Sequence, residues 1–296
     1  MRVELVAVPS GLGLMPRGVE RAPAALRDAG LAARLGARRA HTVPVPPWSP
    51  RRDAATGLLN PDGLVVMATR LADTVSEVLA GGGFPVVLGG DCSILLGPML
   101  ALRRRGRHGL LHVDGHADFW HPSQEDLGEA ASLDLALVTG RGPDLVTDLE
   151  GLVPLVRDDD VAQLGYRSAE NDSYLKQHVR DTAITVHDLD DVRRDGIVAC
   201  TAGALAVVAG DQLDGFWLHL DVDVLDDELM PAVDYREPGG LSWEQAQHVL
   251  AAAVASGRMV GVQLTIYNPD LDGPGAPLAG RIVDLLGAGL GVRVAA

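Results

Sequence analysis

Residues 110–119 read LLHVDGHADF, an apolar run that passes directly into three polar side chains, Asp114, His116 and Asp118. Two other segments have the same form: VVLGGDCS at residues 86–93 and FWLHLDVDVLD at residues 216–226. A short and almost continuously apolar stretch is typical of a strand buried on both faces, as in a parallel sheet covered by helices. These three segments therefore predict where the central strands end and where the polar chemistry gathers.

Short apolar runs alternate with longer amphipathic segments along the whole chain. We expect strands at Val3–Val8, Pro85–Leu88, Leu110–Val113, Thr182–Val186, Phe216–Val222 and Met259–Thr265. We expect helices at Ala22–Leu35, Leu64–Leu79, Ile94–Arg104, Trp243–Ala255 and Leu278–Leu285, the fourth of them begun by a capping box of Ser242 and Gln245. This alternation predicts an α/β fold, doubly wound around a mostly parallel sheet. The proline-rich stretch 43–50 is typical of a loop or strand edge and not of a linker, so we expect one domain over residues 1–296.

Composition excludes several classes of protein. Acidic side chains outnumber basic ones 40 to 25, a formal charge of −15, whereas a nucleic-acid binder needs a basic surface. Two cysteines are too few for a disulfide framework and fit a reducing compartment. The first ten residues are too short an apolar run for a secretory signal, and no run approaches the ~18 residues of a membrane helix. We expect a soluble, cytoplasmic protein that binds neither nucleic acid nor membrane.

The spacing of the polar residues favours a metal site. Residues two apart on a strand point the same way, so Asp114 and His116 can converge, as can Asp221 and Asp223. In open α/β sheets, ligands bind outside the carboxyl ends of the strands. Carboxylates gathered there would repel one another unless cations separated them, and carboxylate oxygens with one imidazole suit Mn(II). Either acidic pair alone is common in loops and helix caps, and the metal interpretation depends on finding both.

Taken together, the three segments resemble a known family. Gly-Gly-Asp-Cys-Ser, Asp-Gly-His-Ala-Asp and Asp-Val-Asp-Val-Leu-Asp look like the signature segments of the arginase/agmatinase ureohydrolases, in the family's order. The match extends to Glu237–Ser242 and to Asn268-Pro269, and so covers most of the chain. The resemblance implies a three-layer α/β/α fold, two Mn(II) ions with a bridging hydroxide, and a homo-oligomer, either a trimer or a hexamer.

The resemblance also implies a role for each ligand. By position, Asp114 and Asp221 would bridge both metals, Cys92 and Asp118 would complete one site, and His116 and Asp223 would complete the other. Hydroxide attack on a guanidinium carbon would then expel an amine and leave urea.

One ligand position departs from the family, which usually has histidine where this chain has Cys92. A free cysteine is usually a small buried apolar residue, and that interpretation stays open. If Cys92 ligates a metal, its thiolate adds a negative charge and a softer donor, which would allow Fe(II) or Zn(II) in place of Mn(II).

Two further signature residues are missing. Ile266 stands where the family has the glutamate that pairs with the guanidinium, and Ala131 stands at the place of its proton-shuttle histidine. Glu129 is our candidate for a catalytic and substrate-binding acid, Glu170 for contact with a substrate amino group, and His121 for proton transfer. Residues of this kind are more often ordinary solvated loop residues, and that interpretation stays open for each of the three.

These observations favour a hydrolase that cleaves a C–N bond of a guanidino or amidino compound and releases urea. One alternative is a formimino or amide hydrolase, which would release no urea, and another is a metal-binding family member without catalysis. Of the strand histidines, His112 is interpreted as structural, and His187 and His219 as satisfied strand residues.

Overall fold

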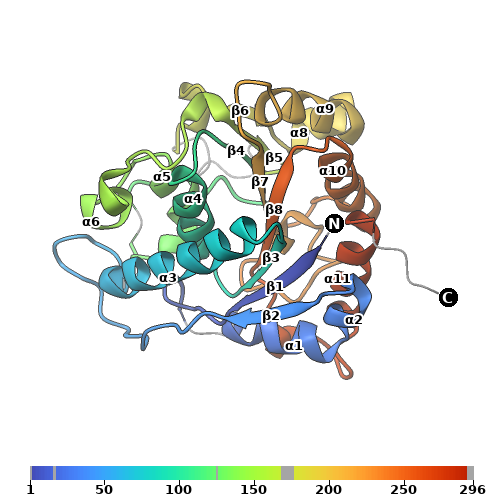
Figure 1. Cartoon of the computed structure of the whole chain (residues 1–296), viewed down its shortest axis with the longest axis horizontal. Helices are drawn as coiled ribbons and strands as arrows, with labels where there is room; N and C mark the ends of the chain where they lie inside the picture. Colours follow the sequence, from blue (N-terminus) through green and yellow to red (C-terminus); the bar gives the residue numbers. More distant parts are fainter. Residues whose placement is uncertain (1, 16–17, 125, 168–176, 292–296) are drawn as a thin grey trace.

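The computed structural model describes residues 2–15, 18–124, 126–167 and 177–291, and within them eight parallel strands form one sheet (Figure 1). The strand order is β2-β1-β3-β8-β7-β4-β5-β6. The bounds are β1 (Val3–Val8), β2 (Arg39–Thr42), β3 (Phe84–Gly89), β4 (Gly109–Val113), β5 (Val161–Leu164), β6 (Thr185–His187), β7 (Phe216–Asp221) and β8 (Met259–Thr265).

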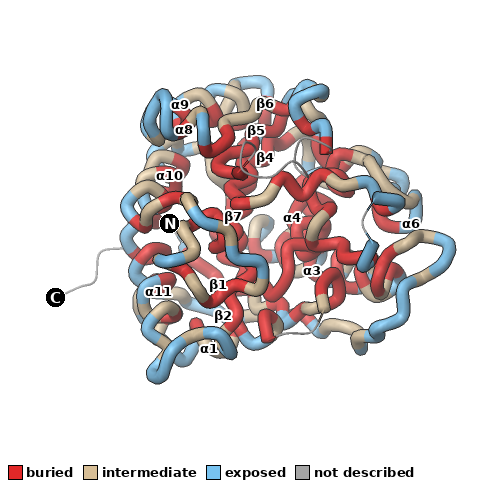
Figure 2. The backbone as a smooth tube through the Cα atoms, turned by 180° about the vertical axis from the view of Figure 1, so that it is seen from behind, coloured by how far each residue is buried: buried red, intermediate tan, exposed pale blue. Residues whose placement is uncertain are grey.

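Helices cover both faces of this sheet. One apolar core lies under α3 (Pro61–Ala80), α4 (Leu96–Arg103), α5 (Asp134–Val138) and α6 (Asp144–Thr147). The other lies under α1 (Ala22–Asp28), α2 (Leu31–Leu35), α8 (Leu189–Asp195), α9 (Ile197–Val208), α10 (Trp243–Ala255) and α11 (Pro277–Gly289). The buried backbone gathers in the strands and the inner helix faces, and the exposed backbone in the outer turns (Figure 2). The predicted α/β class, with a parallel sheet between two helical layers, is confirmed.

The bounds predicted for individual strands and helices agree with the observed bounds to different degrees. β1, β8 and α10 have the predicted bounds, and both hydrogen bonds of the Ser242–Gln245 capping box are present. The helix predicted over Ala22–Leu35 is two helices, because Gly30 adopts a left-handed conformation with φ of 90°. The strand predicted from Thr182 begins only at Thr185, and β2 and β5 were not predicted.

The strand order decides where the polar segments meet. β3, β8, β7 and β4 are neighbours and run parallel, so their carboxyl ends lie at one edge of the sheet. The three polar segments follow β3, β4 and β7, and therefore converge there. Among the described residues, no helix combines the length and apolar character needed to cross a membrane.

Candidate metal centre

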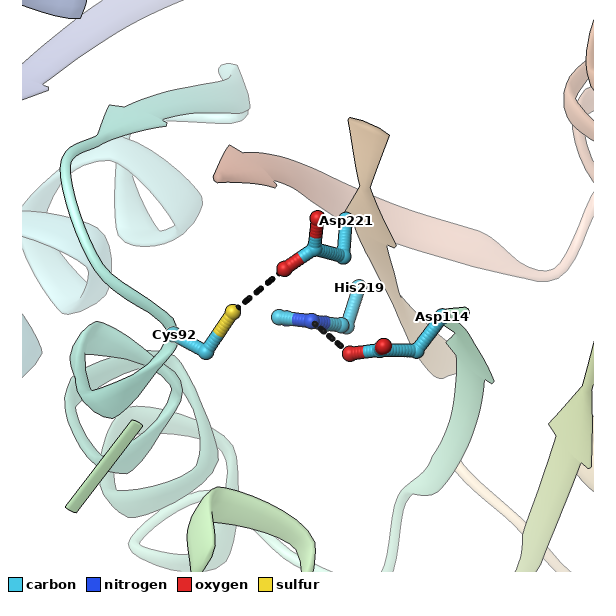
Figure 3. Close-up of side chains that lie close together, drawn as sticks. All are labelled: Cys92, Asp114, His219 and Asp221. Atoms are coloured by element: carbon cyan, nitrogen blue, oxygen red, sulfur yellow. Dashed lines mark hydrogen bonds and ion pairs between the residues drawn. The ribbon is translucent and has the colours of Figure 1, made fainter. Parts of the chain in front are cut away.

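Asp114 and Asp221 stand side by side at the centre of the site. Asp221 is the last residue of β7, Asp114 follows β4, and the register pairs Val113 with Leu220. Cys92 approaches from the turn after β3, and its Sγ lies 2.7 Å from Asp221 Oδ2 (Figure 3). The same sulfur lies 3.2 Å from Thr265 Oγ1. Cys92, Asp114 and Asp221 are all buried, so a thiol and two carboxylates lie close together with little exposure to solvent.

On the other side of Asp114, the turns after β4 and β7 hold His116 against Asp223. His116 Nδ1 lies 3.0 Å from Asp223 Oδ2 and 3.8 Å from Asp114 Oδ1. The Gly115 amide donates to Asp223 Oδ1 at 3.2 Å, and a Cβ on Gly115 would meet the Asp223 carbonyl oxygen at 2.6 Å. Glycine at position 115 is what lets the two turns approach so closely.

Asp118 completes the predicted set. It is buried, and its backbone has a positive φ of 44°, an uncommon conformation for a residue with a side chain. Ligand atoms of Asp114, His116 and Asp118 all lie within 4.8 Å of one another. The structure thus brings all six residues predicted as metal ligands into one cluster, and their individual roles remain predictions.

Burial and mutual repulsion dominate the electrostatics of this cluster. Burial, then the charge of Asp223, raises the pKa of Asp114 from 3.8 to about 7. Burial and the neighbouring carboxylates also raise the pKa of Asp118 and of Asp221 well above the ordinary value. Burial raises the pKa of the Cys92 thiol, with Asp221 adding to the effect. Without cations, the site therefore favours the protonated forms of these carboxyl and thiol groups, whereas a metal ion binds their ionised forms.

The pKa values of His116 and Asp223 are dominated by the attraction between these two residues, which form an ion pair. Burial lowers the pKa of His116, but the charge of Asp223 outweighs it and raises that pKa to about 9. The pKa of Asp223 is raised by burial and lowered more by His116 and by Arg167. Arg167 is itself buried and donates to the carbonyl oxygens of Asp223 and Leu225, both at 3.0 Å. It is a fixed cation that also holds the turn after β7 in place.

Three residues that the sequence analysis did not assign to the site lie directly beneath it. His112 and His219 are register partners on β4 and β7, and their rings stack with centroids 4.5 Å apart. Asp134, the first residue of α5, lies 3.2 Å from His112 Nε2 through Oδ1. The parity of the two histidines with Asp114 and Asp221 was a sequence signal for their position. For Asp134, which comes from a separate segment, the sequence offered none.

Within the described residues, several buried polar atoms of this cluster lack a hydrogen-bond partner: Asp114 Oδ2, Asp134 Oδ2, His112 Nδ1 and His219 Nε2. The interpretation of His219 as a satisfied strand residue holds for Nδ1, which lies 2.8 Å from Gln263 Nε2, and fails for Nε2. Nε2 of His187 also lacks a partner within the described residues. Buried carboxylate oxygens are costly when unpaired, and divalent cations bind such oxygens readily. The donor set fits a metal centre better than it fits an ion-free core.

A cavity of about 440 Å³ opens above the cluster. Cys92, His116, Asp118, Asp221 and Asp223 line it, so five of the six predicted ligands face it. Its remaining wall is formed by Leu14, Trp120, Leu127, Glu129, Ala131, Ser132, Gln177, Asp234, Tyr235, Arg236, Glu237 and Ile266. The volume is in the range of sites for small ligands.

The residues predicted to contact the substrate or transfer protons differ in where they lie relative to the cavity. Glu129 lines the cavity although it is only 1% exposed, and it accepts hydrogen bonds from the Tyr235 hydroxyl at 3.0 Å and the Met15 amide at 3.3 Å. His121 is exposed, contacts Ser123, and does not line the cavity. Glu170 lies outside the described residues. Of the two candidates within the described residues, Glu129 lines the cavity and His121 does not.

Ile266, which replaces the family's acidic residue, also lines the cavity. Its φ is 68°, in the left-handed region that a β-branched side chain rarely adopts. Its amide donates to the Gly90 carbonyl at 2.8 Å, which ties the end of β8 to the turn after β3. The position is thus fixed by the backbone, and an apolar side chain projects where a charge would be expected.

Comparison with known proteins gives a consistent result. The model of the Arginase family matches residues 1–287. An arginase of Brevibacillus brevis is 29% identical over 279 residues, which is 91% of each chain, and one of Staphylococcus aureus (strain MRSA252) is 27% identical over 281 residues, again 91% of each. The native structure of the arginase from Bacillus caldovelox superposes with a TM-score of 0.90 at 26% identity, covering 99% of both chains.

Proposed function

The chain belongs to the arginase family of ureohydrolases, and on this premise we propose that it hydrolyses a C–N bond of a guanidino or amidino compound and releases urea. One observation carries the proposal: a cavity for a small ligand whose floor is made of metal-type donors, Asp118, Asp221 and Asp223 with Cys92 and His116. The reaction would need a divalent metal centre at this floor.

We assign the donors to two ions. Asp114, which follows β4, and Asp221, the last residue of β7, would be shared by both ions. Cys92 and Asp118 would hold one ion, and His116 with Asp223 the other. Two divalent ions, when bound, polarise the bond to be cleaved and lower the pKa of water at the site to near neutrality. We propose Mn(II) as the native metal, with Fe(II) or Zn(II) as alternatives because of the Cys92 thiol.

Glu129, which also lines the cavity, would bind the substrate. Its carboxylate is buried and is held in place by the Tyr235 hydroxyl and the Met15 amide, so it would need little rearrangement to accept a hydrogen bond from a guanidino or amino N–H. It would also stabilise a positive charge on the substrate, which a buried cation requires.

Ile266 limits the choice of substrate. A guanidinium placed against its side chain would have no anionic partner there. The pocket therefore either uses Glu129 as that partner or takes a less basic substrate, such as an N-hydroxy or N-acylated guanidine. Both routes predict weak activity on L-arginine and on agmatine.

The test is a panel of guanidino and amidino compounds incubated with Mn(II)-loaded protein, with urea as the measured product. Urea release from at least one compound is expected. Product without urea would replace the proposal by a formimino or amide hydrolase. No turnover across the panel with ions bound would favour a binding protein.

A matched pair of variants tests the role of Glu129. With a cationic substrate, Glu129→Gln should lower turnover sharply, since the amide keeps the shape and loses the charge. Glu228→Gln removes an exposed glutamate outside the cavity and controls for net charge. Equal turnover in the two variants would contradict the assignment of Glu129.

We also propose that the protein works in the cytoplasm as a homo-oligomer. The two cysteines support a reducing compartment, because both are free and buried. Light scattering on the purified protein would measure the oligomeric state.

A further inference from the structure

The residues beneath the cavity, which the ligand assignment above leaves without a role, suggest an additional ligand. We propose that Asp134 is a direct ligand of the ion on the Cys92 side, oriented by His112. This inference rests on the proposed two-ion centre and adds a residue to it. Asp134 does not line the cavity, so it would reach the ion from the side of the protein core.

The two oxygens of Asp134 have different surroundings. Oδ1 is 3.2 Å from His112 Nε2, which fixes the carboxylate in orientation. Oδ2 is buried and has no hydrogen-bond partner among the described residues. Ligating carboxylates in proteins are commonly held in this way, with one oxygen hydrogen-bonded and the other on the metal.

Asp134 belongs to a set of donors that could share one ion. Ligand atoms of Cys92, Asp118 and Asp134 lie within 4.8 Å of one another. A metal–sulfur bond is ~2.3 Å long and a metal–oxygen bond ~2.1 Å. A sulfur and an oxygen on one ion therefore lie about 3.6 Å apart at a tetrahedral angle, and about 4.4 Å apart on opposite sides of the ion. Small side-chain adjustments would therefore close the three donors on a single cation.

His219 is also close to this set, but its hydrogen bonds exclude it as a ligand. The Trp217 indole can only donate, and it donates to Gln263 Oε1 at 3.0 Å, so the other end of the amide is its NH₂ group. That group lies 2.8 Å from His219 Nδ1, which must accept and therefore carries no proton. The proton of a neutral His219 then lies on Nε2, the nitrogen that faces the centre, where it blocks coordination.

The stacked histidines cannot hold an ion of their own either. An imidazole binds a metal in the plane of its ring, and the rings of His112 and His219 are parallel to within 9° with centroids 4.5 Å apart. No ion can lie in both planes and contact both rings. The pair can still orient carboxylates. His112 holds Asp134 through Oδ1, and His219 Nε2 lies 3.5 Å from Asp114 Oδ2 and 3.8 Å from Asp134 Oδ2.

Asp134 would change the metal preference of the Cys92 side. With Asp114 and Asp221 shared, this ion would have one sulfur and four carboxylate groups around it. More than four donors, mostly oxygen, suit Mn(II) or Fe(II), whereas structural Zn(II) is almost always four-coordinate. The Cys92 thiolate would then not by itself make the site a zinc site.

The first experiment compares Mn(II) affinities of wild-type protein and Asp134→Asn by competition with a chelating dye. The asparagine keeps an acceptor for His112 but loses the ligating charge. We expect one of two ions to bind at least about 100-fold more weakly, beyond the ~10–100-fold loss usual for residues that only support a ligand. Asp234→Asn is the matched control, because it removes a carboxylate of the cavity wall whose two oxygens contact Asn268.

The second experiment needs no variant. Anomalous diffraction from Mn(II)-loaded wild-type crystals should place an Asp134 oxygen at ~2.0–2.3 Å from the ion on the Cys92 side. Two results would overturn this inference alone. One is a crystal structure with two ions in which Asp134 lies more than about 3 Å from both. The other is a folded Asp134→Asn variant that binds both ions with wild-type affinity. A wild-type protein that takes up no ion would instead overturn the proposed function.

Discussion

The metal-free protein should lose stability as the pH rises, because its carboxylates are gathered without cations. The pKa of Asp114 is raised by burial and by Asp223, from 3.8 to about 7, so the folded state holds a proton that the unfolded state has released. Stability falls with pH wherever the folded state binds more protons than the unfolded state. The loss is therefore expected between about pH 4 and pH 7.

Asp114 makes one contribution to this loss; the raised pKa values of Asp118 and Asp221 add to it, and the lowered pKa of buried His219 opposes it. For Asp114, a pKa of 3.8 raised to about 7 corresponds to roughly 4 kcal/mol over the whole range, of which more than half is lost between pH 5 and pH 8. His116 acts in the same direction: its pKa is raised from 6.5 to about 9, so the stability it adds below pH 6.5 is lost as the pH rises toward 9. The lowered pKa of Asp223 adds stability above pH 4 and does not change in this window.

The assay is urea unfolding of chelator-treated protein at pH 5, 6.5 and 8, repeated with saturating Mn(II). Bound ions favour the ionised carboxylates, so the metal-loaded protein should not show the loss, and the stabilisation by metal should grow with pH. Metal-free protein as stable at pH 8 as at pH 5, or more so, would refute this reasoning about the cluster.

Three further predictions concern single residues. Asp221→Asn should lower the occupancy of both ions, measured by elemental analysis, because Asp221 is assigned to both; loss of one ion only would remove that assignment. Cys92→His should raise the Mn(II)-to-Zn(II) affinity ratio by about tenfold or more in competition experiments, since imidazole is a harder ligand than thiolate, and an unchanged ratio would assign Cys92 to packing. Ile266→Glu should raise kcat/KM for L-arginine about 10–100-fold through a charge-assisted contact with the guanidinium, and no gain would show that position 266 does not face that group.

Much of the fold could be predicted because its signals are local. The strands at Val3–Val8 and Met259–Thr265 are mostly apolar runs, and the capping box at Ser242 marks a helix start. β2 was missed because Arg39–Thr42 is an edge strand without an apolar run, and β5 because four residues carry little pattern. The break in the first predicted helix was visible as Gly30, but a glycine inside a helical pattern does not always end it.

The residues of the site also divide into those that local sequence signals predict and those that depend on long-range packing. The ligands at 114, 116, 221 and 223 follow from parity at strand ends, which the sequence contains. The relation of Asp134 to His112 depends on how α5 packs under the sheet, and the stacking of His112 on His219 depends on the register of β4 with β7. Such long-range distances cannot be read from one sequence. The prediction of one domain over residues 1–296 stays a prediction.

The most direct test of the two-ion hydrolase is a titration of the metal-free enzyme. Mn(II) is added in fractions of one equivalent per chain, and urea release is measured with the best guanidino compound of the panel. The rate should be negligible without metal and should reach its plateau at two ions per chain. Full turnover by the metal-free protein, or a plateau at a single ion, would contradict the account.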